Sequence, residues 1–420
     1  MHSPSSDRTT VPSPGPDADS DSDAVPARVA RRGLPLPVYL LAFSLFGMGS
    51  AEFLVAGVLP DIAGDLRISL PSAGWLISAY AIGVVVGGPP LAVLTLRWPR
   101  RTTLVTTQFL FAAAAAAGLL THDYVLFLAT RFVCGLAYAG YFAVATVTAI
   151  GLVPFNRTAR ASGVVVSGLG LAMVLGGPAG ALLSHFTGWR GGFWAVVALT
   201  CVGAVLTLTA VPSTNAGVRP SVRRELRTLR RPRLWLVFAV TLLSTAAYMI
   251  TYNYLAPLLR DVTGVADVWV PGVLTLFGVG SFVGLSWGGR ISDRRPHQAL
   301  LIGGIGIAVV SALIATFAGQ AVVAIPLVLL LGVAGFVLNP AQYGRVFALA
   351  SGAPTLAGAT TVSMFQLGIS LVPLLAGIAL DAGAGLSFLP WIGVALALLA
   401  VLTVLLDRRN VDLPDMAREG

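Results

Sequence analysis

The 420-residue sequence contains no lysine, and all 27 of its basic residues are arginine. Without lysine the chain has no GxxxxGK[ST] phosphate-binding loop, and no polar segment is long enough to form a nucleotide-binding domain. These two absences count against an ATP-driven pump.

Charge, cysteine and histidine are also scarce. Only 11% of the residues are charged, against about a quarter in a soluble protein. Cys134 and Cys201 fall in apolar runs without metal-ligand or disulfide spacing, so we interpret them as small buried residues. The four histidines are scattered over a tail, loops and span ends. No metal pair or nucleophile constellation is present, so we expect neither a membrane enzyme nor a cofactor.

Long apolar runs are what the sequence has instead. Runs of about 20 residues cross a ~30 Å hydrocarbon core as helices, and these are too long and continuous for barrel strands. We therefore predict an all-α polytopic membrane protein with twelve spans. The expected spans lie near residues 38–59, 73–94, 102–120, 124–150, 161–184, 191–211, 234–258, 269–289, 299–318, 322–343, 355–379 and 385–406.

Polar segments divide the chain into parts. Residues 1–33 are rich in Ser, Pro and Asp and are expected to be disordered. The basic linker 212–233 separates two groups of six spans, residues 34–211 and 234–406. A short tail, 407–420, completes the predicted organisation.

The distribution of arginine predicts the orientation. The termini and every second loop hold most of the arginines, whereas the alternate loops hold only Arg67, Arg190 and Arg260. The positive-inside rule then places both termini in the cytoplasm. Topology thus accounts for the net charge of +9, and no nucleic-acid partner is expected. We interpret the linker as a solvated topogenic loop, with contact to anionic lipid as the alternative.

The two groups of spans resemble each other. A shift of 197 positions places Gly83 on Gly280 and Gly87 on Gly284. A parallel duplication of six helices is the repeat known from the two halves of major facilitator transporters.

Three motifs resemble those of the major facilitator superfamily. GGRISDRRPHQAL (288–300) is similar to its loop signature, with Gly288, Asp293 and Arg294 on the glycine, acidic and basic positions, whereas Leu96 replaces the acid in the first-half copy. RFVCGLAYAG (131–140) resembles its fourth-helix motif. GLGLAMVLGGPAGALL (168–183) resembles the fifth-helix motif of exporters, with its small and kinking positions at Gly176, Gly177, Pro178 and Gly180.

The resemblance extends to one branch of the superfamily. GMGSAEFLVAGVLPDIAGDL (47–66) is similar to the first helix of chloramphenicol-resistance exporters, a pattern that carbohydrate exporters share. This implies a multi-pass protein of a bacterial cytoplasmic membrane, with two pseudo-symmetric six-helix bundles, alternating access and a functional monomer. It also implies proton-coupled efflux of a small amphiphilic compound such as chloramphenicol, with sugars or another metabolite as the alternative. Duplicated halves and the exporter-like fifth helix argue against a channel or receptor.

Glu52 is the candidate proton-coupling residue, because it is a carboxylate deep in an apolar span. A charge at that depth is costly unless it pairs, faces water or binds a proton. Arg131 is the candidate cation, since it lies at a similar depth, about 10 Å from the same end of its own span. The alternatives are a structural glutamate at a helix contact and an arginine that clamps helix-end carbonyls.

Two further sets of residues complete the predicted site. The Gly-Pro cluster at 176–180 is expected to seal the outer pathway, or else to serve ordinary close packing. Aromatic and neutral polar residues suit an amphiphilic ligand, although several tyrosines would also suit helix packing. The predicted substrate-binding residues are Tyr138, Tyr141, Tyr248, Tyr252, Asn253, Asn339, Gln342 and Gln366.

Overall fold

The computed structural model describes residues 34–94, 98–154, 158–212, 231–292, 294–350 and 354–416. Within them it has 12 helices long and apolar enough to cross a membrane, which confirms the predicted number. The tail 1–33 and nearly all of the linker 212–233 lie outside the described residues, so the predictions made for them stay predictions.

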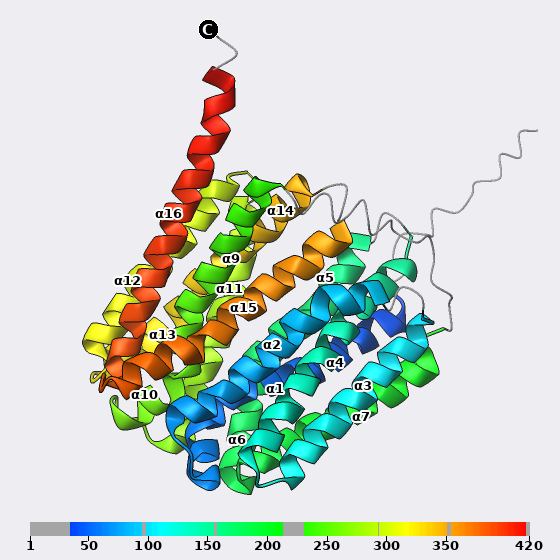
Figure 1. The fold of residues 1–420 in the computed structure, drawn as a ribbon, viewed down its shortest axis with the longest axis horizontal. Coiled ribbons are helices and arrows are strands. Elements are labelled where there is room, and N and C mark those ends of the chain that lie inside the picture. The colour runs from blue at the N-terminus through cyan, green and yellow to red at the C-terminus, as the bar shows by residue number, and fades with distance from the viewer. Residues whose placement is uncertain are drawn as a thin grey trace, which may run out of the picture. The chain divides into compact units, whose positions relative to one another are not determined.

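The first six spans form what we call the first half. They are α1 (Leu36–Leu66), α2 (Leu70–Leu94), α3 (Arg100–Leu120), α4 (Tyr124–Gly151), a fifth span made of α5 (Thr158–Leu171), the π-helix η3 (Ala172–Gly176) and α6 (Gly177–Thr187), and α7 (Trp189–Ala210). Their order along the chain can be followed by colour in Figure 1.

The last six spans form the last half. They are α9 (Pro232–Asn253) continued by α10 (Leu255–Asp261), η4 (Asp267–Trp269) with α11 (Val270–Ser292), α12 (Pro296–Phe317), α13 (Ala321–Val337) continued by α14 (Asn339–Leu349), α15 (Pro354–Asp381), and η5 (Leu386–Phe388) with α16 (Leu389–Met416).

Two helix boundaries differ from the sequence prediction. Helix α1 was expected to end near residue 59, but it continues through Pro60 to Leu66. Proline removes only one backbone hydrogen bond, and a helix surrounded by other helices tolerates that loss. Helix α16 continues to Met416, through residues predicted to be a tail.

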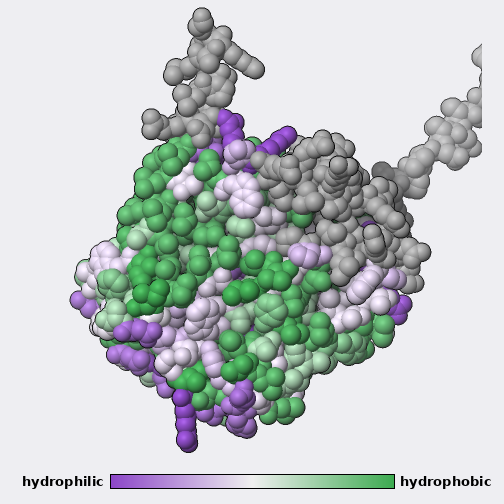
Figure 2. Space-filling view, in the orientation of Figure 1, coloured by the Kyte–Doolittle hydropathy of each residue, from purple (hydrophilic) through white to green (hydrophobic). Residues whose placement is uncertain are grey.

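The outer surface is that of a protein that lies in lipid. Figure 2 shows hydrophobic residues over much of the visible face, with strongly hydrophilic residues gathered near its margins. Large apolar side chains point outward, among them Leu120 (72% exposed) and Val322 (88% exposed). An exposed apolar surface of this extent is stable only when another apolar phase covers it.

Close glycine contacts repeat between the halves. A Cβ atom on Gly83 of α2 would collide with the carbonyl oxygen of Phe132 in α4, and one on Gly280 of α11 with that of Leu329 in α13. Phe132 and Leu329 are separated by the same 197 positions as the two glycines. The duplication expected from the sequence is therefore also a duplication of helix contacts.

Two pairs of spans make the most extensive contacts between the halves. Helix α2 lies beside α15 (Figure 1), where Ser78 Oγ donates a hydrogen bond of 2.7 Å to the Ser370 carbonyl oxygen. The second pair is η3 and α6 against α11, where a Cβ on Gly278 would lie 2.5 Å from Val174 Cα. Close backbone approach of this kind depends on the small residue.

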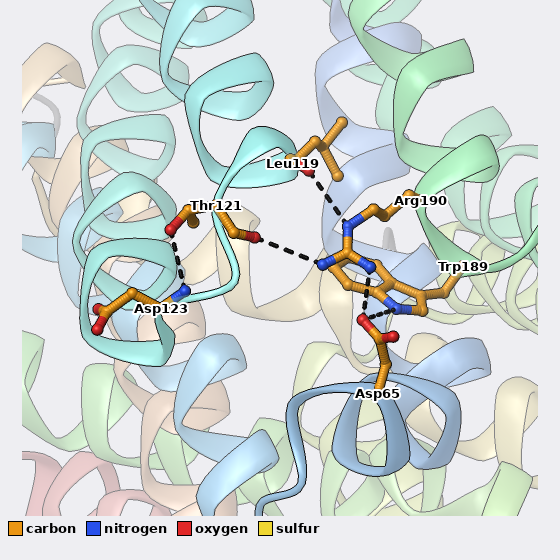
Figure 3. A network of polar contacts seen from close by, with 6 residues as sticks. All are labelled: Asp65, Leu119, Thr121, Asp123, Trp189 and Arg190. Carbon is orange, nitrogen blue, oxygen red and sulfur yellow. Dashed lines mark hydrogen bonds and ion pairs between the residues drawn. The ribbon is translucent and has the colours of Figure 1, made fainter.

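A polar network ties together one end of the first half (Figure 3). Arg190 at the start of α7 pairs with Asp65 near the end of α1 and stacks on Trp189, 4.3 Å from its ring centroid. Its guanidinium also donates to the carbonyl oxygens of Leu119 (3.2 Å) and Thr121 (3.4 Å), where α3 ends. One side chain therefore joins α1, α3 and α7.

Replacing Arg190 by alanine should destabilise the protein by about 1–2 kcal/mol, because it removes charge-assisted hydrogen bonds at a partly exposed site. The measurement is the thermal unfolding midpoint in detergent, followed by tryptophan fluorescence. Arg290→Ala on the exposed end of α11 is the matched control. Equal midpoints for the two variants would show that the network contributes nothing to stability.

Candidate functional site

Glu52 lies in the interior of the bundle between side chains of both halves. Gln366 of α15 lies within side-chain hydrogen-bonding reach of its carboxyl group, and Arg131 of α4 lies within electrostatic reach. The glutamate itself is only partly exposed. Since α4 belongs to the first half and α15 to the last, the carboxyl group interacts with both.

Arg131 is held by the first half. Only 4% of the residue is exposed, Nε donates to the Leu76 carbonyl oxygen at 3.4 Å, and the guanidinium lies 4.7 Å from the Tyr80 ring centroid. The described residues contain no ion pair within 4.0 Å between Arg131 and Glu52. The arginine therefore bonds to a carbonyl oxygen within α2, not at a helix end, and also acts on Glu52 through space.

Four of the predicted substrate-binding residues surround Glu52. Tyr138, Tyr248 and Tyr252 lie near enough to interact with it electrostatically. Gln366 is the fourth, within side-chain hydrogen-bonding reach. The Tyr252 ring stacks on Phe277 with centroids 4.2 Å apart. The Tyr252 hydroxyl and Gln366 Oε1 are buried and lack a hydrogen-bond partner. Both atoms are therefore available to a ligand.

The other predicted substrate-binding residues are placed differently. Tyr141 is fully buried and donates a hydrogen bond of 3.1 Å to the Leu41 carbonyl oxygen within the first half. Gln342 is also fully buried, and its amide donates to Ser244 Oγ at 2.9 Å. Both contacts join neighbouring helices. Asn253 Nδ2 and Asn339 Oδ1, in contrast, are buried without a partner.

The predicted Gly-Pro cluster packs against α1 on either side of Glu52. A Cβ on Gly176 would collide with Ser50, and one on Gly177 would lie 2.8 Å from Phe53 Cβ. These two glycines end the π-helical turn η3 and begin α6, with Pro178 in the first turn. A Cβ on Gly180 would lie 2.9 Å from the Leu54 side chain. The cluster therefore fixes the stretch of α1 that carries the carboxylate.

The predicted loop signature is described only in part. Gly288 packs on the carbonyl oxygen of Val337, whereas Arg294 is exposed. Asp293 lies outside the described residues. The gating interaction expected of this loop therefore stays a prediction.

An ion-paired cluster that the sequence reasoning missed connects the halves. Arg260 at the end of α10 pairs with Asp61 of α1 at 3.0 Å and with Asp267 of its own half at 2.8 Å. All three side chains are partly exposed. Asp61 and Asp65 are one helical turn apart, so α1 is bound to the last half by one carboxylate and to its own half by the other.

A second missed residue is Asp407, which the sequence reasoning assigned to the C-terminal tail. It is 2% exposed in α16, and its carboxylate pairs with Arg345 of α14. His297 Nε2 of α12 lies 3.9 Å from the same carboxylate oxygen. The sequence signal for this ion pair was Arg345 near the end of an apolar span, and hydropathy cannot show that Asp407 is the partner of Arg345. Within the described ranges, no group of three or more His, Cys, Asp or Glu residues is arranged to hold a metal ion.

Comparison with known proteins identifies relatives over most of the chain. The sequence profile of the Major Facilitator Superfamily matches residues 41–373. A "Chloramphenicol resistance protein" of Streptomyces lividans is 40% identical over 356 residues, which cover 84% of this chain and 91% of that protein. An "Inner membrane transport protein" of Escherichia coli is 33% identical, covering 89% and 96% of the two chains.

Two further comparisons agree with these. A "Chloramphenicol efflux pump" of Mycobacterium tuberculosis is 29% identical over 81% of this chain and 84% of its own. The solved structure of a variant of the nucleoside transporter NupG superposes with a TM-score of 0.71 at 14% identity, covering 89% of this chain and all of that one. At this identity the likeness bears on the fold alone.

Replacing Gly177 by leucine should destabilise the protein by about 1–3 kcal/mol, because the added side chain has to displace Phe53 and α1. Gly170→Leu in the same span is the matched control, since a Cβ there meets no atom within 4 Å. The check is the difference in thermal unfolding midpoint between the two variants. A Gly177 variant as stable as the control would contradict the tight contact.

Proposed function

This chain belongs to the major facilitator superfamily, and we propose that it exports a small amphiphilic compound, chloramphenicol or one like it, in exchange for protons. Relatives named for chloramphenicol resistance and efflux support the choice of substrate. The observation that carries the coupling is the position of Glu52, an interior carboxyl group between Gln366 of the last half and Arg131 of the first.

Protonation of Glu52 would act on both halves at once. The ionised carboxylate attracts Arg131 and accepts a hydrogen bond from the Gln366 amide. Binding a proton removes the negative charge and weakens both interactions. A change of charge at this one site can therefore alter the balance between two arrangements of the halves.

Substrate and proton would compete near the same place. Tyr138, Tyr248 and Tyr252 surround Glu52, so a ligand among these rings lies beside the carboxyl group. Each occupant would then favour release of the other. Exchange in opposite directions across the membrane follows when only one side of the site is open at a time.

Alternating access assigns roles to the contacts between the halves. The bridge from Arg260 to Asp61 would close the outer end of the bundle. This assignment of the outer end follows when both termini lie in the cytoplasm, with the protein in a bacterial inner membrane. An exposed pair of this kind contributes about 0.2–1 kcal/mol, so it can be broken in each cycle. The Gly-Pro cluster would seal the route between α1 and α11 against protons. Two bundles, 34–211 and 234–406, working as a monomer in lipid complete the proposal.

Replacing Glu52 by glutamine should abolish chloramphenicol efflux driven by a proton gradient, because glutamine cannot exchange a proton. Binding of chloramphenicol should remain measurable and should lose its dependence on pH. Purified protein in proteoliposomes with an imposed pH gradient gives the first result, and equilibrium binding in detergent the second.

The control is Asp381→Asn, which removes an exposed carboxylate at the end of α15. It should leave gradient-driven efflux at the wild-type level. Gradient-driven efflux at full rate in the Glu52→Gln protein would refute the proposed coupling.

Replacing Arg260 by alanine should shift the protein toward states that are open at the Asp61 end, because the bridge between the halves is lost. The ratio of open to closed states should change by about fivefold at most. Spin labels at Gly64 and Gly272, in a background without Cys134 and Cys201, would report the distance between α1 and α11. A distance distribution that is unchanged by Arg260→Ala would argue against a gate at this bridge.

The matched control for this experiment is Asp267→Ala. It removes the pair within the last half and keeps the bridge from Arg260 to Asp61. We expect its label distances to match those of the parent protein. If Asp267→Ala also lengthened the distance between the labels, the segment between α10 and α11, rather than the bridge from Arg260 to Asp61, would set that distance.

A further inference from the structure

Three aromatic side chains form a stack on α14 and α15. The Tyr343 ring lies 6.3 Å from Phe347 at an interplanar angle of 24° and 5.6 Å from Phe365 at 30°. Stacks of this kind normally belong to a packed core. Here Phe347 is 42% exposed, and Tyr343 and Phe365 are partly exposed.

The exposed side of the stack faces the interior of the bundle. On α15, Ser370 bonds to α2 and Gly368 packs on α9, which places these neighbours on nearly opposite faces. Leu374, one turn beyond Ser370, and Ile378, one turn further, are 41% and 63% exposed, as expected for contact with lipid. Phe365 is nine residues from Leu374 and therefore lies on the opposite face of the helix, directed toward the centre.

The first half presents aromatic rings toward the same region. Tyr138 of α4 lies 5.9 Å from Tyr80 and 6.3 Å from Phe142, measured between ring centroids. Tyr138 is also close enough to Tyr343 to interact with it electrostatically, and Phe142 is partly exposed. Rings from both halves therefore approach each other across the interior.

The polar groups near these rings are almost all neutral. The Tyr80 and Tyr252 hydroxyls and Gln366 Oε1 are buried without a hydrogen-bond partner. Glu52 and Arg131 carry opposite charges and lie within reach of each other. A ligand with its own charge would need an additional counter-charge here, whereas an uncharged ligand with hydrogen-bonding groups would not.

We propose that Tyr343, Phe347 and Phe365 form one wall of the substrate site, that Tyr138 and Phe142 form the opposite wall, and that the planar aromatic ring of an uncharged substrate binds between them. The proposal rests on the export function inferred above and adds a selectivity of the exporter for uncharged, planar aromatic substrates. Aromatic rings favour uncharged planar ligands through stacking, and the unpaired hydroxyl and amide groups fix their polar substituents.

The test measures equilibrium binding of radiolabelled chloramphenicol to purified protein in detergent, where no proton gradient is needed. Phe365→Ala and Phe347→Ala should each raise Kd about threefold to tenfold, the range expected for loss of an aromatic contact. Phe365→Leu preserves apolar volume and should still raise Kd. Phe282→Ala on α11, where the ring is 68% exposed, is the matched control and should bind as the wild type does.

Transport in proteoliposomes provides a second readout. The Phe365 variants should raise KM for chloramphenicol and leave the maximal gradient-driven rate near that of the wild type, because Glu52 is intact. An excess of ethidium, a planar cation, should not displace chloramphenicol. Thermal unfolding midpoints identify any variant that is misfolded. If Phe365→Ala is misfolded, Phe365→Leu provides the KM and Kd values for this position.

The outcomes separate the two proposals. Wild-type affinity in Phe365→Leu and Phe347→Ala, or displacement by ethidium, would overturn the aromatic site even if proton-driven export holds. Saturable binding that is weakened by these variants, in a protein without gradient-driven efflux, would support the site and refute the exchange mechanism. Absence of saturable chloramphenicol binding to the wild type would overturn the aromatic site as stated.

Discussion

The position of one carboxyl group constrains much of this structure. Glu52 lies in the middle of an apolar helix, where an isolated charge is costly. Its compensation comes from two directions, from Arg131 in the first half and from Gln366 in the last. A group stabilised by only one half would be indifferent to how the halves are arranged. Because both contribute, the charge on Glu52 and the contact between the halves depend on each other.

Holding that group in place requires α1 to be positioned closely. The glycines of η3 and α6 pack against Ser50 and Phe53, the neighbours of Glu52 on α1, and the same span continues into contact with α11. Only residues without a side chain permit this approach. The Gly-Pro motif therefore serves close packing against α1. Control of the route between the halves, the other predicted role, belongs to the proposed mechanism and is compatible with that packing.

The sequence predicted what hydropathy and periodicity encode, and little beyond. Twelve spans, the duplication and the interior position of Glu52 follow from local patterns. The bridge from Asp61 to Arg260 does not, because its partners are 199 positions apart and each looks like an ordinary loop charge. Asp407 was assigned to a tail because its neighbours are polar, yet Arg345 pairs with it inside the bundle. Tyr141 shows the converse, since an aromatic residue with a polar tip also suits helix packing.

The repeat duplicates packing without duplicating charge. Gly83 and Gly280 make the same contact, and the residues that correspond to Tyr80 and Arg131 at the same offset are Phe277 and Val328. In the first half an arginine lies over the aromatic ring, whereas in the last half Tyr252 stacks on it. The charged pair thus belongs to one half, and the last half contributes aromatic and neutral hydrogen-bonding groups. Gln366, Tyr248 and Tyr252 are where the last half meets the carboxyl group of that pair, so an effect of its protonation on the last half would pass through these neutral groups.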